Sequence, residues 1–294
     1  MQLSPSVRGP NGGPTEAGAP RPAYVLPAIA HPLPEEPVPL IDAPQLHRPC
    51  WFDLSTSDVE AAKSLYSELF GWSYEDMGPA FGHYTIARTP NGRAAAAMAP
   101  KMPGQEEMPT VWTVYWGTAD ADATVARIEA NGGRMMVPPM EIPGSGRMAI
   151  ATDPDGAVFG LWQADPFIGA EIEGEHGSMC WSEVNSRNGA GNAAFYASVF
   201  DLAVHKLDMP GVVYHTVHPA GGGDAVAGVL QMDEHWAGIP PNWMPYFAVA
   251  DLDLANAIWA KHGGKIMAGP IASPYGRIMV VQDPQGGYLS YMAA

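Results

Sequence analysis

The chain repeats itself at a spacing of about 130 residues, and this repeat constrains the fold more than any other feature. The stretch CWFDLSTSD at 50–58 returns as CWSEVNSRN at 180–188, and VWTVYW at 111–116 returns as NWMPYF at 242–247. The stretch GRMAIATDPDGAVFGLW at 146–162 returns as GRIMVVQDPQGGYLSYM at 276–292. We therefore expect two homologous domains, at residues 47–166 and 178–294, joined by a linker at 167–177.

Each copy divides once more into two similar units. Apolar residues recur at helical spacing over 58–70 and over 120–131, and Gly71 is expected to close the first of these helices. Short runs that favour strands lie at 50–56, 82–88, 93–99, 111–117, 134–137, 147–152 and 157–163. Four βαβββ units result, and the predicted fold class is α+β.

Residues 1–46 differ from the rest of the chain in composition. The first 45 residues contain 11 of the 30 prolines, few large apolar residues and no periodicity. Such a segment buries too little apolar surface to offset the entropy lost on ordering, so we expect a disordered or extended arm.

Composition also narrows the compartment and the partners. No run of about 20 apolar residues predicts a membrane span, and the first ten residues do not form a secretory signal. Two cysteines in 294 residues favour a reducing cytoplasm over a disulfide framework. The net charge of −16 disfavours nucleic-acid binding, because the phosphate backbone is also negative.

Two motifs carry a resemblance to a known family. Tandem βαβββ units with Y-x-x-L-F-G-W at 66–72 and D-P-D-G at 153–156 resemble the vicinal oxygen chelate superfamily. This group contains glyoxalase I, extradiol dioxygenases, fosfomycin-resistance enzymes and bleomycin-binding proteins. The segments GRMAIATDPDGAVFGLWQ and IGAEI are similar to two-domain actinobacterial glyoxalase-like proteins. The resemblance covers about residues 47–294 and implies cupped mixed sheets whose concave faces line cavities.

The same resemblance identifies where metal-dependent members place their ligands. The corresponding positions are Trp51, Thr113 and Gly160 in the first copy, and Trp181, Met244 and Ser290 in the second. A chelate site needs several nitrogen, oxygen or sulfur donors that converge on one point, and indole has no lone pair to give. We therefore predict no metal and no other cofactor.

One face of the first strand in each copy carries the candidate chemistry. Strand alternation places these side chains on it: Trp51, Asp53 and Ser55 in the first copy, and Trp181, Glu183 and Asn185 in the second. By resemblance this face lines the cavity. A carboxyl group beside an indole in an apolar pocket has a raised pKa, which suits a general acid or base, so Asp53 and Glu183 are the catalytic candidates. The alternative is a structural role in ion pairs or hydrogen bonds that join the domains, with Arg147 and Arg277 as the candidate partners.

Other residues are candidates for binding a ligand. Tyr115 and Tyr246 lie two residues after Thr113 and Met244, so their side chains point to the same face of the strand. We therefore expect these tyrosines, rather than Trp112 and Trp243, to line the cavities. Ser290 completes the second cavity. Arg147 and Arg277 are candidates to anchor a carboxylate or phenolate, with pairing to a local aspartate as the alternative. By the same alternation, Cys50 and Cys180 are expected to face away from the cavities.

Three functions remain open from the sequence. The leading hypothesis is a metal-independent isomerase, cyclase or lyase of secondary metabolism that acts on a hydrophobic aromatic or carbonyl-bearing molecule. The alternatives are a small-molecule sequestering protein of the bleomycin-resistance type and a metal-dependent dioxygenase or glyoxalase. We expect a monomer, which would be an internal pseudo-dimer, or a homodimer. The sequence does not decide whether each cavity forms within one half or across the two.

Overall fold

The computed structural model describes residues 40–209, 211–273 and 275–293, and the arm predicted at 1–46 therefore lies mostly outside the described residues. The first half contains β1 (Pro49–Thr56), α1 (Val59–Phe70), β2 (Ser73–Asp76), the short helix η1 (Pro79–Phe81), β3 (Thr85–Arg88), β4 (Ala94–Pro100), β5 (Val111–Gly117), α2 (Ala121–Ala130), β6 (Arg134–Ile142), β7 (Gly146–Thr152) and β8 (Val158–Ala164).

The second half repeats this order. It contains β9 (Met179–Ser186), α3 (Gly189–Phe200), β10 (Leu202–Met209), β11 (Val212–Pro219), β12 (Ala227–Gln231), η2 (Glu234–Trp236), β13 (Asn242–Ala248), α4 (Leu252–Lys261), β14 (Lys265–Ser273), β15 (Gly276–Gln282) and β16 (Tyr288–Ala293). The predicted fold class is confirmed.

Each half forms one mixed eight-stranded sheet. The strand order is β2-β3-β4-β1-β5-β8-β7-β6 in the first half and β10-β11-β12-β9-β13-β16-β15-β14 in the second. The central strand β1 runs parallel to β4 and antiparallel to β5. Both βαβββ units of a half therefore share one sheet, and each concave face is built within a half and not across the duplicated halves.

Local sequence signals explain where the helices begin and end. The side chain of Asp58 accepts a hydrogen bond from Ala61 N at the start of α1, and Asn188 caps α3 in the same way through Gly191 N. At the end of α1, Gly71 adopts a left-handed conformation with φ of 72°, as its predicted closing role requires. None of the described helices is long and apolar enough to cross a membrane.

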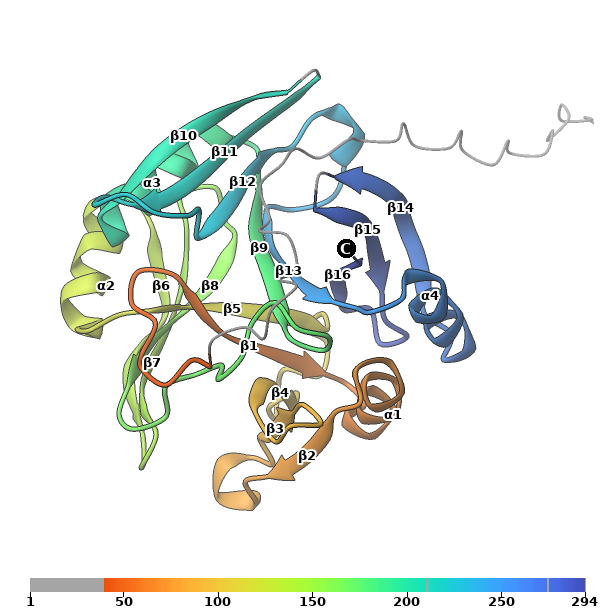
Figure 1. The fold of residues 1–294 in the computed structure, drawn as a ribbon. Helices are drawn as coiled ribbons and strands as arrows, with labels where there is room; N and C mark the ends of the chain where they lie inside the picture. The colour runs from red at the N-terminus through yellow and green to blue at the C-terminus, as the bar shows by residue number, and fades with distance from the viewer. Residues whose placement is uncertain (1–39, 210, 274, 294) are drawn as a thin grey trace, which may run out of the picture.

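The helix-bearing faces of the two sheets pack against one another around one shared core. Figure 1 shows α1 beside α4 at one end of this interface and α2 beside α3 at the other. Aromatic rings from both halves fill the core, and Trp116 of β5 stacks on Phe200 of α3 with ring centroids 4.4 Å apart. The opposite, concave faces of the sheets carry two separate clusters of buried side chains.

The aspartate of each D-P-x-G turn joins the two halves. Asp153 Oδ1 accepts the backbone N–H groups of its own turn, while its Oδ2 accepts the hydroxyl of Tyr196 from the other half at 3.0 Å. The pseudo-equivalent pair is Tyr66 and Asp283, at 3.2 Å. The segments are turns, as the sequence predicts, and they are also interdomain contacts between α1 or α3 and the opposite sheet.

Candidate functional site

The concave face of the first sheet, which we call cup 1, contains a hydrogen-bonded chain of four side chains. Asp53 Oδ2 accepts hydrogen bonds from the hydroxyl groups of Tyr115 at 2.9 Å and Tyr84 at 3.1 Å. The indole Nε1 of Trp51 donates to the Tyr84 hydroxyl at 2.7 Å. Tyr115 of β5 and Tyr84, which precedes β3, thus converge on the carboxylate of Asp53 in β1, and Trp51 holds the hydroxyl of Tyr84.

The concave face of the second sheet, cup 2, repeats the same chain. Tyr246 donates to Glu183 Oε1 at 2.7 Å, and Tyr214 donates to Glu183 Oε2 at 2.8 Å. Trp181 Nε1 donates to the Tyr214 hydroxyl at 3.1 Å. The duplicated Trp-x-carboxylate is therefore part of a duplicated Trp–Tyr–carboxylate–Tyr cluster.

Tyr84 and Tyr214 were not among the residues predicted from the sequence. Both lie in the least similar part of the two copies, where no shared motif marks them. The signal that identifies them is their spacing, because they are separated by the same 130 residues as Trp51 and Trp181.

The three smaller predicted binding residues lie on the cup faces. Ser290 is fully buried and pairs with Tyr246 between β13 and β16. Asn185 is also fully buried, and its side-chain amide donates to Asn242 Oδ1 at 3.1 Å. Ser55 is half-buried, two residues beyond Asp53. Ser290 is therefore adjacent to the cluster of cup 2, whereas Ser55 and Asn185 lie at the end of their strands.

Arg147 and Arg277 lie on the opposite faces of the sheets, away from both cups. Arg147 pairs with Asp122 of α2 at 2.8 Å. Arg277 is exposed and shares its side of β15 with Met279 and Val281, which belong to the helix-side core. The structure therefore excludes both arginines as ion-pair partners of the cup carboxylates and as anchors for a ligand inside the cups. For Arg147 the predicted alternative, pairing with a local aspartate, is confirmed. Strand parity is the reason, since their neighbours in the strands point into the cups.

The two tryptophans of β5 and β13 belong to the shared core, as strand parity predicts. Trp112 and Trp243 are buried on the helix side of their sheets. The cysteines differ from expectation, because a bulge at the start of each central strand shifts the register. Cys50 and Cys180 consequently pack with the cup clusters, where burial raises the pKa of each thiol to about 12. Neither thiol is poised as a nucleophile.

Burial dominates the electrostatics of the two clusters. It raises the pKa of Asp53 from 3.8 to about 6, although the hydroxyl groups of Tyr115 and Tyr84 act in the opposite direction. Burial also raises the pKa of Glu183, and hydrogen bonds from Tyr246 and Tyr214 partly offset this. A carboxyl group with a pKa near 6 can exchange a proton at neutral pH, which is the property that a general acid or base needs.

The positions that hold ligands in metal-dependent relatives do not form a chelate set. In cup 1, Trp51 pairs with Tyr115, and Tyr115 pairs with Gly160, whose position has no side chain to donate. Tyr115 occupies this space, since a Cβ added to Gly160 would lie 2.1 Å from the tyrosine ring. Within the described part of the chain, no three His, Cys, Asp or Glu side chains gather in a way that could hold a metal ion. The residues at these positions do not fit a chelated metal ion.

Comparison with known sequences identifies the family. Residues 48–161 match the model of the glyoxalase/bleomycin resistance protein/dioxygenase superfamily. The putative glyoxylase CFP32 of Mycobacterium tuberculosis is 40% identical over 248 residues, which cover 83% of this chain and 94% of that protein. The chain belongs to this superfamily. The anthracycline biosynthesis protein DnrV of Streptomyces peucetius is 36% identical over 256 residues, covering 82% and 91% of the two chains.

Solved structures of the superfamily share the fold. The Mn(II)-bound glyoxalase from Novosphingobium aromaticivorans superposes with a TM-score of 0.58 at 16% identity, covering 85% of this chain and 82% of that one. The 2,3-dioxygenase LapB from Pseudomonas sp. KL28 gives a TM-score of 0.58 at 13% identity, covering 85% and 93%. At these identities the similarity establishes the fold alone.

Proposed function

We propose that this superfamily member is a metal-independent enzyme that moves a proton on a hydrophobic aromatic or carbonyl-bearing small molecule, with Asp53 of cup 1 as the general base. The observation that carries the proposal is Asp53 itself, a half-buried residue whose carboxylate has a pKa raised by burial and is held by two tyrosine hydroxyls. Cup 1 supplies both a proton acceptor and neutral hydrogen-bond donors at one point.

The difference in accessibility between the two cups supports cup 1 as the place of the chemistry. Asp53 and Tyr84 are partly exposed, whereas Glu183 is 3% exposed and Tyr214 is 1% exposed. A group that exchanges protons with a substrate must reach it, within about 3 Å. Although Glu183 is the pseudo-equivalent carboxylate, we assign it a structural role.

The cluster can perform a proton transfer without any other group. Asp53 takes a proton from the carbon next to a carbonyl group, and the electron pair of that C–H bond moves onto the carbonyl oxygen. Protonation of Asp53 weakens it as an acceptor, so the hydroxyls of Tyr84 and Tyr115 become available to stabilise the enolate oxygen. Where a C=C bond is conjugated with the enolate, return of the proton to its γ carbon gives an isomer, with no net change in atoms or electrons.

The walls of cup 1 favour an apolar substrate. Ile86, Met148, Ile150 and Phe167 surround the cluster and contribute no charge. Phe167 lies edge-on to Trp51 with ring centroids 4.9 Å apart, so flat aromatic surface is already present. The similarity to a protein named for anthracycline biosynthesis supports a substrate from an antibiotic pathway.

Hydrogen exchange at carbon tests the proposal directly. Anthrone and α-tetralone are hydrophobic aromatic ketones with acidic C–H groups, and proton NMR in deuterium oxide follows the loss of those protons. We expect the protein to accelerate exchange of at least one of them and Asp53→Asn to abolish the acceleration. Binding of the ketones with no exchange would instead identify a sequestering protein of the bleomycin-resistance type.

A further inference from the structure

We propose that a pocket between the two halves, separate from both cups, binds a cationic amphiphilic small molecule. Such a ligand has an apolar body, a hydrogen-bond-accepting oxygen and a protonated amine. The pocket has a volume of about 680 Å³, which is within the range of small-molecule sites, and such sites are common between domains.

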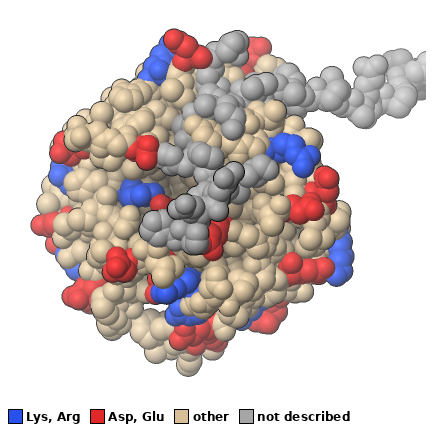
Figure 2. All heavy atoms as spheres, in the orientation of Figure 1, with Lys and Arg blue, Asp and Glu red and all other residues tan. Residues whose placement is uncertain are grey.

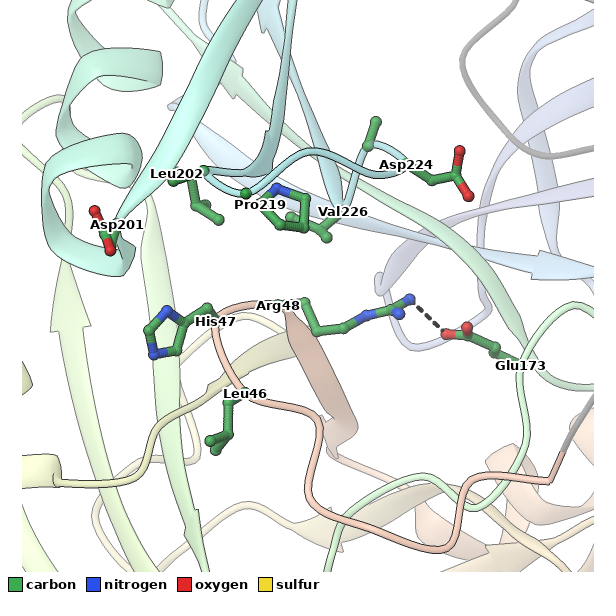
Figure 3. Close-up of a pocket in the computed structure, with 12 residues that line it drawn as sticks. Leu46, His47, Arg48, Glu173, Asp201, Leu202, Pro219, Asp224 and Val226 are labelled. Atoms are coloured by element: carbon green, nitrogen blue, oxygen red, sulfur yellow. Dashed lines mark hydrogen bonds and ion pairs between the residues drawn. The ribbon is translucent and has the colours of Figure 1, made fainter.

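Three segments that are distant in sequence form this pocket (Figure 3). The chain before β1 supplies Arg48, the linker supplies Glu173, and the start of β10 with the β11–β12 loop supplies the remaining wall. That wall is mainly apolar, with Leu202, Pro219 and Val226 facing the segment that carries Arg48. The body of a hydrophobic ligand therefore has a surface to cover.

The segment that carries Arg48 is held rigidly at the end of β5. His47 adopts a left-handed conformation with φ of 60°, which is strained for a residue other than glycine. Its N–H donates to Gly117 O at 2.8 Å, and Gly117 N donates to Arg48 O at 2.9 Å. A Cβ at Gly117 would lie 1.9 Å from Gln45 O, so glycine is required for this close approach. The direction of Arg48 is thus set by the backbone.

The guanidinium of Arg48 has a buried nitrogen, Nε, without a hydrogen-bond partner among the described residues. Its Nη2 pairs with Glu173 Oε2 at 2.8 Å. Its Nε is buried and makes no hydrogen bond within the described part of the chain. A buried donor without an acceptor is unfavourable, and a carbonyl, hydroxyl or sulfonyl oxygen on a ligand would satisfy it.

The charges that line the pocket select the sign of the ligand. Arg48 contributes one positive charge, and Glu173, Asp201 and Asp224 contribute three negative charges. The chain as a whole carries a net charge of −16. A positively charged group on the ligand is therefore attracted to the pocket, and a carboxylate is repelled.

Three dansyl probes with the same fluorophore but different charge test the proposal. Dansylcadaverine carries an amine, dansylamide is neutral and dansylglycine carries a carboxylate, while all three present sulfonyl oxygens. Titration followed by dansyl emission should give the tightest binding for dansylcadaverine, about tenfold tighter than for dansylglycine. Asp201→Asn with Asp224→Asn should weaken the amine by about three- to tenfold and leave dansylamide within twofold, since each exposed ion pair contributes modestly.

Two further variants locate the site. A Cβ added at Gly221 meets nothing within 4 Å, so the backbone there accepts a side chain, and the bulk of Gly221→Trp in the pocket lining should abolish probe binding. Thr113→Met fills cup 1 instead, and probe binding should remain. Tighter binding of the anionic probe, no binding of any probe, or loss of binding in Thr113→Met alone would overturn the proposal. The proposed reaction of cup 1 has the opposite dependence on these two variants, so the two proposals fail separately.

Discussion

Cup 1 and cup 2 contain the same cluster in different surroundings. In cup 1 the carboxylate is an aspartate whose two tyrosines share one oxygen, Oδ2. In cup 2 it is a glutamate, and each oxygen accepts one tyrosine. The longer side chain at 183 thus has each oxygen engaged by a tyrosine, whereas both tyrosines of cup 1 hold the same oxygen of Asp53 and Thr113 is a further hydrogen-bond partner of this carboxylate.

The residues around the clusters also differ in size. Directly beside the carboxylate the second half has the smaller residue, because Gly228 pairs with Glu183 where Ala97 pairs with Asp53. Three positions facing the cups are larger in the second half, where Met244 replaces Thr113, Leu230 replaces Ala99 and Ser290 replaces Gly160. The carboxylate residue of cup 2 is also less exposed than that of cup 1, since Glu183 is 3% exposed and Asp53 is half-buried. The same cluster therefore stands in two different surroundings, and the proposal that cup 1 is the active site rests on the greater exposure of Asp53 relative to Glu183.

On the visible face of the molecule, Lys and Arg alternate with Asp and Glu around the periphery (Figure 2). That face therefore shows no large region of a single charge that would bind a charged partner. The difference between the cups is therefore the property that the predictions below address.

The largest expected effect is on turnover after neutralising the two carboxylates. Asp53→Asn should lower the rate of carbon hydrogen exchange by about 10²–10³-fold, because general base catalysis contributes roughly this much. Its matched control, Glu183→Gln, should stay within about twofold. Exchange rates by NMR for anthrone or α-tetralone check both, and equal losses in the two variants would contradict the assignment of chemistry to cup 1.

The second effect comes from giving cup 1 a residue of cup 2. Thr113→Met introduces the side chain that stands opposite Glu183 in the second half. It should weaken binding of the ketone by at least about tenfold, because the added bulk lies beside Asp53. Calorimetric titration measures the affinity. Unchanged affinity would mean that the ligand does not enter cup 1.

The third effect is a pH dependence with opposite signs for rate and stability. A base must be ionised, so the exchange rate should fall as pH drops through about 6, by about tenfold at pH 5. Stability behaves in the reverse way. The raised pKa means that the folded state binds the proton more tightly than the unfolded one, so this contribution is present below about pH 4 and lost as pH rises to about 6.

Asp53→Asn should remove both trends. Denaturant unfolding at several pH values, compared with the exchange rates, checks the pair of slopes. A rate that rises toward low pH would instead identify Asp53 as a general acid.

Much of this arrangement follows from the sequence alone. The repeat predicts two sheets with four βαβββ units, and strand alternation correctly places Asp53, Glu183, Tyr115 and Tyr246 on the concave faces. These features depend on local periodicity, which the sequence records directly. Strand β2 was not predicted, because its residues, SYED, follow no strand pattern and it is an edge strand whose four residues all pair with β3.

Other features depend on register and on packing between distant segments. The cysteines face the cups because bulges shift the central strands by one residue, which the pattern of residue types does not reveal. Tyr84 reaches Asp53 from another strand pair, and the contacts of Asp153 and Asp283 cross between the halves. The difference in accessibility between the cups is likewise a sum of many side-chain volumes rather than a motif.

The smallest expected effect compares stability after removing one tyrosine hydroxyl from each cup. Tyr246→Phe leaves Glu183 Oε1 buried without its donor and should lower the free energy of unfolding by about 1–3 kcal/mol. Tyr115→Phe should cost less than about 1 kcal/mol, since Asp53 Oδ2 keeps its hydrogen bond from Tyr84 and the carboxylate is partly exposed. Urea unfolding provides both values.

A third tyrosine serves as the control for that measurement. Tyr288 is 41% exposed and lies outside both clusters, so Tyr288→Phe should leave the free energy of unfolding unchanged within about 0.5 kcal/mol. If Tyr115→Phe destabilises the protein as much as Tyr246→Phe, the carboxylate of cup 1 depends on its tyrosines as fully as that of cup 2. Cup 1 would then be as closed as cup 2 in solution, and the accessibility that assigns the chemistry to Asp53 would be lost.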